Sequence, residues 1–128
     1  MLREGIICIV IVIMIFIGNI VTQNYTKSSV EELSKNLEEL RIDLEKENNE
    51  KAILDKIDKV NQEWRNRHDK LAYYIEHKEL ELVETNMTAL KSFIETKEYK
   101  EAINELDKSV FELKHIQDKY AFNLENVL

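Results

Sequence analysis

The residues that usually form turns are almost absent from this chain. No proline occurs in its 128 residues, and both glycines, Gly5 and Gly18, lie near the N-terminus. A β-sandwich or β-barrel is therefore not expected from residue 19 onward. Loops that bind phosphate need glycine where the backbone approaches the ligand, so P-loop and dinucleotide-binding motifs are excluded too. The sequence predicts an all-α protein that is helical over nearly its whole length.

The charge balance is acidic, with a formal net charge of −7 and 34% charged residues. No stretch concentrates lysine and arginine, which argues against nucleic acid as a partner and against docking on anionic lipid headgroups. The single cysteine, Cys8, can form neither an internal disulfide nor a paired-cysteine zinc site. The charged surface is typical of a soluble helical domain.

The N-terminal segment is apolar without a break from residue 6 to 17, and Ile20 and Val21 extend the run. Residues 5–22 would span about 27 Å as a helix, which is enough to cross the hydrocarbon core of a bilayer. We therefore predict a transmembrane anchor over residues 1–23, with membrane lipid as its partner. No Ala-x-Ala-like cleavage site follows the run, so we expect an uncleaved signal-anchor. A buried core helix is the alternative, but the run has no polar face.

The orientation of this anchor is weakly determined by charge. Arg3 precedes the apolar run, while Lys27 and Lys35 follow it, so the positive-inside rule hardly discriminates. Because the N-terminal tail is short, we expect it to stay inside and the C-terminal domain to be extracytoplasmic. The predicted location is the cell membrane, as a single-pass protein.

Residues 24–128 are predicted to form an acidic helical bundle with helices near 29–47, 50–77, 79–95 and 97–122. Apolar residues recur at steps of three and four, and the short connections force neighbouring helices to run antiparallel. Ser28 and Ser29 begin capping-box patterns, so the first helix could start there, or the anchor helix could run straight through. We expect the first seam to pack within its own domain rather than against a second copy. The predicted seams are Val30, Leu33, Leu37, Leu40 and Leu44; Ile53, Ile57, Val60, Trp64, Leu71 and Ile75; Leu80, Val83, Met87, Leu90 and Ile94; and Tyr99, Ala102, Ile103, Leu106, Val110, Leu113, Ile116 and Tyr120.

The three histidines are the first candidates for metal ligands. His68 and His77 are nine residues apart, so they point to opposite sides of a continuous helix. His115 has Glu112 three residues before it, but bundle sites of the di-iron type need two such Glu-x-x-His pairs. We therefore predict no metal site and no cofactor.

Each histidine also has a structural interpretation. His68 follows Trp64 by one turn and is expected to pack against its ring. His115 follows Phe111 by one turn and is expected to flank an apolar contact. His77 is expected to lie at the end of the second helix, where a cation favours the helix dipole.

No arrangement of residues indicates catalysis. Paired carboxylates such as Glu31 and Glu32 lie on solvated faces, where a pKa suited to acid–base chemistry is not expected. We predict no catalytic residue and no enzymatic activity. Trp64 and Tyr74 are expected to pack inward, whereas Arg67 and Tyr73 are expected to be exposed and able to contact a protein partner.

Several stretches carry a family resemblance. They are Trp64 with His68, the run Tyr-Ile-Glu-His-Lys-Glu-Leu at 74–80 followed by Glu84, Glu-Tyr-Lys-Glu-Ala at 98–102, and Phe-Asn-Leu-Glu-Asn-Val at 122–127. In these stretches the chain resembles, over nearly its full length, domain-of-unknown-function family 4363, small membrane-anchored helical proteins of clostridial type. Lys78 stands where this family often has an acidic residue, which disfavours a charged ligand cluster there. The resemblance implies a membrane location and a helical domain, and it implies no activity.

Two functions remain open from the sequence. The first is a protein-interaction module in the cell envelope, acting on an envelope protein or through self-association. The alternative is a ligand- or metal-sensing helical domain that uses Glu76, His77 and Glu84 at the hinge between the second and third helices. The candidate interaction or ligand surface comprises Trp64, Arg67, His68, Tyr73, Glu76, His77 and Glu84.

Overall fold

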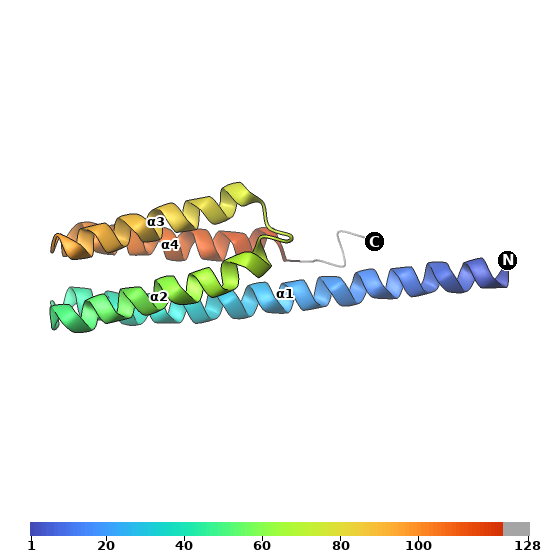
Figure 1. The fold of residues 1–128 in the computed structure, drawn as a ribbon, viewed down its shortest axis with the longest axis horizontal. Coiled ribbons are helices and arrows are strands. Elements are labelled where there is room, and N and C mark those ends of the chain that lie inside the picture. Colours follow the sequence, from blue (N-terminus) through green and yellow to red (C-terminus); the bar gives the residue numbers. More distant parts are fainter. Residues whose placement is uncertain (122–128) are drawn as a thin grey trace.

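The computed structural model describes residues 1–121, which form four α-helices and no strand. Helix α1 covers Leu2–Glu45, α2 Glu50–Leu71, α3 His77–Glu95 and α4 Tyr99–Lys119 (Figure 1). The all-α prediction is therefore confirmed. The end of the predicted last helix at residue 122, and the 122–127 stretch that carries part of the family resemblance, lie outside the described residues.

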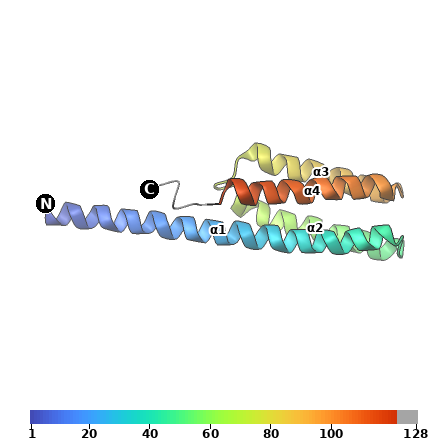
Figure 2. The same cartoon turned by 180° about the vertical axis from the view of Figure 1, so that it is seen from behind.

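The four helices pack as a ring in which α1 contacts α2, α2 contacts α3, α3 contacts α4, and α4 contacts α1. The short connections make successive helices antiparallel, as in an up-down-up-down bundle. Only the C-terminal half of α1 takes part. Its N-terminal half projects from the bundle as a single helix, and Figures 1 and 2 show this from opposite sides.

The bundle core is built from the apolar seams that the sequence predicts. Tyr99, Ile103 and Tyr120 pack at the edge of this core, partly exposed, while the other predicted seam residues are buried. The seam of α1 packs within its own chain, against α2 and α4. Apolar residues spaced three and four apart predict the core correctly because they keep one face of each helix turned toward its neighbours over the full length of the bundle.

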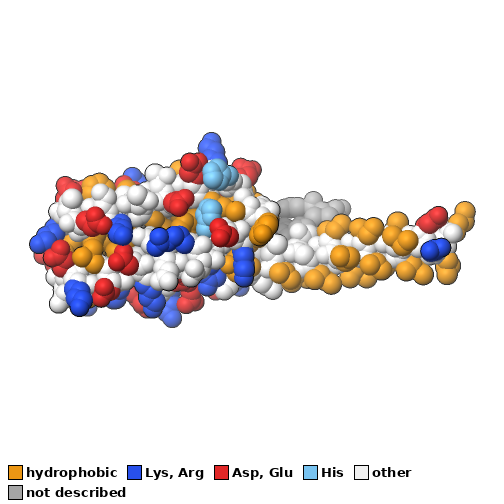
Figure 3. All heavy atoms as spheres, in the orientation of Figure 1, with side chains coloured by type: hydrophobic (Ala, Val, Ile, Leu, Met, Phe, Trp, Pro, Cys, Tyr) orange, Lys and Arg blue, Asp and Glu red, His pale blue; other side chains and the backbone are white. Residues whose placement is uncertain are grey.

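Helix α1 passes from the apolar segment (residues 5–22) into the bundle without interruption. This decides the alternative that the sequence leaves open: no new helix starts at Ser28 or Ser29. The apolar stretch is long enough to cross a membrane, and none of it is buried against the other described residues. Figure 3 shows hydrophobic side chains covering this part of α1, whereas the bundle carries mixed acidic and basic side chains.

The connection between α2 and α3 differs from the prediction. Helix α2 ends at Leu71 rather than at residue 77, and α3 begins at His77 rather than at 79. The backbone tightens after Leu71, because the N–H groups of Tyr73 and Tyr74 donate to carbonyls three residues earlier. His77 therefore lies at the N-terminal end of α3, and its predicted role at a helix C-terminus is wrong.

Two turns are made without glycine. Helices α1 and α3 both end in a Schellman motif, in which residue C″ donates to the C3 carbonyl and residue C′ to the C2 carbonyl. The C′ residues are Glu47, with φ 49°, and Lys97, with φ 60°. Glycine usually occupies this left-handed position because a Cβ atom disfavours it. Both turns therefore carry local strain, which the packing of the helices around them offsets.

The strain at the first turn gives a stability prediction. Replacing Glu47→Gly should raise the unfolding free energy by about 0.5–1 kcal/mol, because glycine tolerates a positive φ. The matched control is Lys46→Gly, since Lys46 has helical dihedrals and should lose stability instead. Denaturant unfolding of the full chain in detergent micelles, followed by circular dichroism, measures both. A loss of stability in both variants would contradict the prediction.

Candidate functional site

Trp64 and His68 pack together as the sequence predicts. Trp64 is buried, and its ring meets the His68 ring edge-on at a centroid distance of 5.7 Å and an interplanar angle of 70°. Glu84, on α3, lies with Trp64 along a shallow pocket of about 180 Å³ between α2 and α3. This part of the candidate surface is a packed helix interface with a small opening to solvent.

Arg67 is not exposed, contrary to the prediction, because its side chain retains only 21% of its accessible area. Its Nη1 donates to Oγ of Ser29 at 2.9 Å, and its Nε donates to Oε1 of Glu63 at 3.3 Å. The guanidinium carbon also lies 5.9 Å from the centre of the Tyr25 ring. Arg67 therefore joins α2 to α1 and has a structural role.

Tyr73 is 88% exposed, as predicted. It lies beside the start of the bundle, where Val21, Tyr25, Lys70 and Tyr74 help to line a shallow pocket of about 340 Å³. The place is next to the point at which α1 leaves the bundle, which sets Tyr73 well apart from the α2–α3 pocket.

The predicted hinge group does not assemble. The backbone N–H of Glu76 donates to Oη of Tyr120 at 2.8 Å, and its carboxylate lies 3.7 Å from Nζ of Lys119. His77 and Glu84 are exposed on α3. Within residues 1–121, the side chains suited to holding a metal ion form a different group, between α3 and α4.

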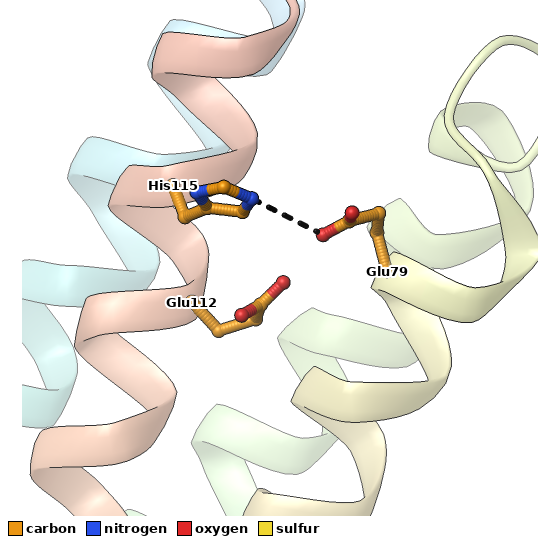
Figure 4. Close-up of side chains that lie close together, drawn as sticks. All are labelled: Glu79, Glu112 and His115. Carbon is orange, nitrogen blue, oxygen red and sulfur yellow. Dashed lines mark ion pairs between the residues drawn. The ribbon is translucent and has the colours of Figure 1, made fainter.

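That group consists of Glu79 on α3 with Glu112 and His115 on α4. One possible ligand atom from each residue lies within 4.8 Å of the others. Nε2 of His115 is 3.9 Å from Oε2 of Glu79, and all three side chains point into the space between the two helices (Figure 4). We call this set the Glu79–Glu112–His115 cluster.

The two helices create this cluster by simple register. Glu112 and His115 are three residues apart on α4, so they share a helix face. Lys97, in the α3–α4 turn, lies midway in the sequence between Glu79 and His115. An antiparallel hairpin that turns at Lys97 therefore places Glu79 and His115 side by side. Glu79 also lies in the first turn of α3, where the helix dipole favours a negative charge.

The carboxyl groups of the cluster differ in acidity. Burial, followed by a hydrogen bond to Glu79 and its negative charge, raises the pKa of Glu112 to about 7. The same hydrogen bond, together with that from Lys119 Nζ at 2.9 Å, lowers the pKa of Glu79. A hydrogen bond between two carboxyl groups requires a proton on one of them, and Glu112 holds it.

Part of this site can be found in the sequence. The spacing of Glu112 and His115 is recognisable there, but without a second such pair it does not predict a metal site, and no local pattern indicates Glu79 or Lys119. The prediction that His115 flanks an apolar contact with Phe111 is wrong, because Phe111 is 72% exposed and His115 faces Glu79 instead. The equal spacing of Glu79 and His115 about Lys97 is the signal that could have found the cluster.

A family model described as Domain of unknown function (DUF4363) matches residues 20–127, which include all of the bundle helices from the C-terminal half of α1 onward. No curated protein and no solved structure matches the chain.

The raised pKa of Glu112 predicts how stability depends on pH. The folded protein keeps a proton up to a pKa of about 7, while the unfolded chain releases it near the ordinary value of 4.5. The unfolding free energy should therefore fall as pH rises between these values. Partial exposure screens the effect to on the order of 1 kcal/mol. The positive charges of His115 and Lys119 lower the pKa of Glu112 and so reduce this effect. The lowered pKa of Glu79 affects the unfolding free energy only at pH values below this window.

Denaturant unfolding in the presence of EDTA, at about pH 5 and about pH 8, measures this dependence. Glu112→Gln should remove the decline, whereas Glu101→Gln, at an exposed position on the same helix, should keep it. An equal decline in Glu112→Gln and the wild-type chain would show that the proton is held elsewhere.

Proposed function

This chain belongs to the family Domain of unknown function (DUF4363), and we propose that it is a single-pass membrane protein whose helical domain acts as a protein-interaction module in the cell envelope. The observation that carries the proposal is the continuity of α1 from the apolar segment into the bundle. A helix shared by membrane span and domain fixes the bundle at the membrane surface. The apolar segment binds lipid, and the bundle presents its side faces to other proteins.

The packing around residue 26 supports a retained span rather than a cleaved signal sequence. Oη of Tyr74 donates to the carbonyl of Thr22 at 3.1 Å and lies 2.6 Å from Oγ1 of Thr26. Thr26 is buried there. Cleavage after the apolar segment would cut α1 inside or beside this contact, and the first turns of the bundle would lose their support.

The side chains at the end of the apolar segment suit a membrane–water interface. Tyr25 and Tyr73 lie there with Lys70, whose Nζ is 5.7 Å from the centre of the Tyr25 ring. Tyrosine is enriched at the level of the lipid headgroups because its ring is apolar and its hydroxyl is polar. In this proposal the apolar segment and these tyrosines together define the depth of insertion.

A side face of the bundle offers a surface for a protein partner. Leu82 on α3 is 45% exposed and Phe111 on α4 is 72% exposed. They lie along one shallow hollow of about 480 Å³, whose rim includes Asn86, Asp107 and Lys108. An aromatic anchor surrounded by polar side chains is typical of protein interfaces. We name this surface the Leu82–Phe111 face and assign it to an envelope protein partner, with no nucleic acid and no catalysis involved.

The topology of this proposal can be tested in intact cells. With Cys8→Ser removing the native thiol, a cysteine at exposed position 50 should react with a membrane-impermeant maleimide, because the bundle is proposed to be extracytoplasmic. The labelled protein should keep the mass of the whole chain, 15.2 kDa plus the label. Labelling only after lysis would contradict the orientation, and a shortened chain would contradict the retained anchor.

The Leu82–Phe111 face can be tested by photo-crosslinking in the native membrane. A photoreactive phenylalanine analogue at position 111 should give one crosslinked product of defined mass, because an interface residue lies in contact with its partner. The matched control is position 59, an exposed lysine on α2, which does not adjoin α4. No product at position 111, or the same products at both positions, would contradict the assignment.

A further inference from the structure

We propose that the Glu79–Glu112–His115 cluster binds one Zn²⁺ ion and thereby joins α3 to α4. Glu112 also borders the hollow of the Leu82–Phe111 face, but the zinc proposal does not depend on the proposed interaction function. The ligands come from two helices, one carboxylate from α3 and a carboxylate and an imidazole from α4.

The ligand types select zinc over the hard cations. Ca²⁺ and Mg²⁺ prefer sites made wholly of oxygen, and Ca²⁺ takes six to eight of them. An imidazole with carboxylates suits zinc, which accepts three protein ligands and keeps a fourth position for water or another ligand. The Glu79–Glu112–His115 cluster supplies that number of protein ligands.

The distances fit with a small contraction. Two ligands of a tetrahedral zinc ion, each about 2.0–2.2 Å from the metal, lie about 3.3–3.6 Å apart. Nε2 of His115 and Oε2 of Glu79 are 3.9 Å apart, and one possible ligand atom from each residue lies within 4.8 Å of the others. Rotations of these side chains would have to close the difference, and half of the His115 side chain faces solvent, which leaves room for its rotation.

The hydrogen bonds around the cluster leave the required atoms available. Nζ of Lys119 donates a hydrogen bond to Oε1 of Glu79 at 2.9 Å, which leaves Oε2 of Glu79 facing His115. Oε1 of Glu112 is buried, and no N–H group or alcohol hydroxyl within residues 1–121 donates to it. A buried oxygen without a partner is costly, and a cation between the helices would satisfy it. Zinc would also take the place of the proton that Glu112 shares with Glu79, because a metal ion binds the deprotonated carboxylates and neutralises their charge.

The position of the site gives the metal a mechanical effect. The beginning of α3 and the end of α4 lie at the end of the bundle from which α1 projects (Figures 1 and 2). A zinc ion there would bind these two helix ends together close to the proposed membrane surface. The fourth coordination position would remain open to solvent or to a ligand brought by a partner.

Calorimetric titration of the full chain with ZnCl₂ tests the site. The protein is prepared in detergent micelles without a histidine tag and freed of metal with EDTA. We expect one Zn²⁺ per chain, at least tenfold weaker binding in His115→Gln and in Glu79→Gln, and unchanged binding in His77→Gln. His77 is the matched control because it is exposed on α3 and lies outside the cluster. CaCl₂ should give no saturable binding.

A second measurement keeps the test independent of misfolding. Circular dichroism should show the wild-type helix content in each variant, and Zn²⁺ should raise the melting temperature of the wild-type chain but not that of His115→Gln, because a ligand that binds the folded state stabilises it. The proposal is overturned if Zn²⁺ binding does not saturate, if it is equally strong in folded His115→Gln, if His77→Gln abolishes it, or if Ca²⁺ binds as tightly.

Discussion

Burial of the α1 seam is the contact on which the rest of the structure depends. Its side chains from Val30 to Leu44 lie against both α2 and α4, and α3 closes the ring between those two helices. Because the same helix continues into the apolar segment, this seam also sets where the bundle lies relative to the membrane in our proposal. A seam turned outward would leave α2 and α4 without a common surface, and the α3–α4 hairpin would lose the packing of α1 against α4.

The absence of glycine beyond Gly18 has a visible consequence at the turns. Two helices end in Schellman motifs whose left-handed positions are occupied by Glu47 and Lys97. Such residues are strained there, so the turns are held by the helices on either side rather than by their own preference. The α3–α4 turn in particular fixes the register that brings Glu79 opposite His115, so a strained turn and the candidate metal site are parts of one hairpin.

Only part of the candidate site follows from local patterns in the sequence. The Glu112–His115 pair is local, because helical periodicity alone places both side chains on one face. Glu79 joins them only through antiparallel pairing across a turn, which no local pattern specifies. The prediction that Arg67 is exposed is wrong for a similar reason, because the burial of Arg67 depends on Ser29 and Tyr25, which belong to another helix. Tyr73 stays exposed as predicted, since nothing from the other helices covers it.

The sequence by itself determined the helices, their buried seams and the apolar segment, because each follows from the composition and spacing of residues close together in the chain. Only the tertiary structure decided that α1 runs unbroken between segment and bundle, that α2 ends at Leu71, and that a histidine and two carboxylates meet between α3 and α4. These features involve contacts between residues far apart in the sequence, such as Tyr74 with Thr22 and Thr26, and Glu79 with His115. Periodicity fixes which face of a helix is buried, but the partner, register and end of that helix are fixed by the packing of the whole bundle.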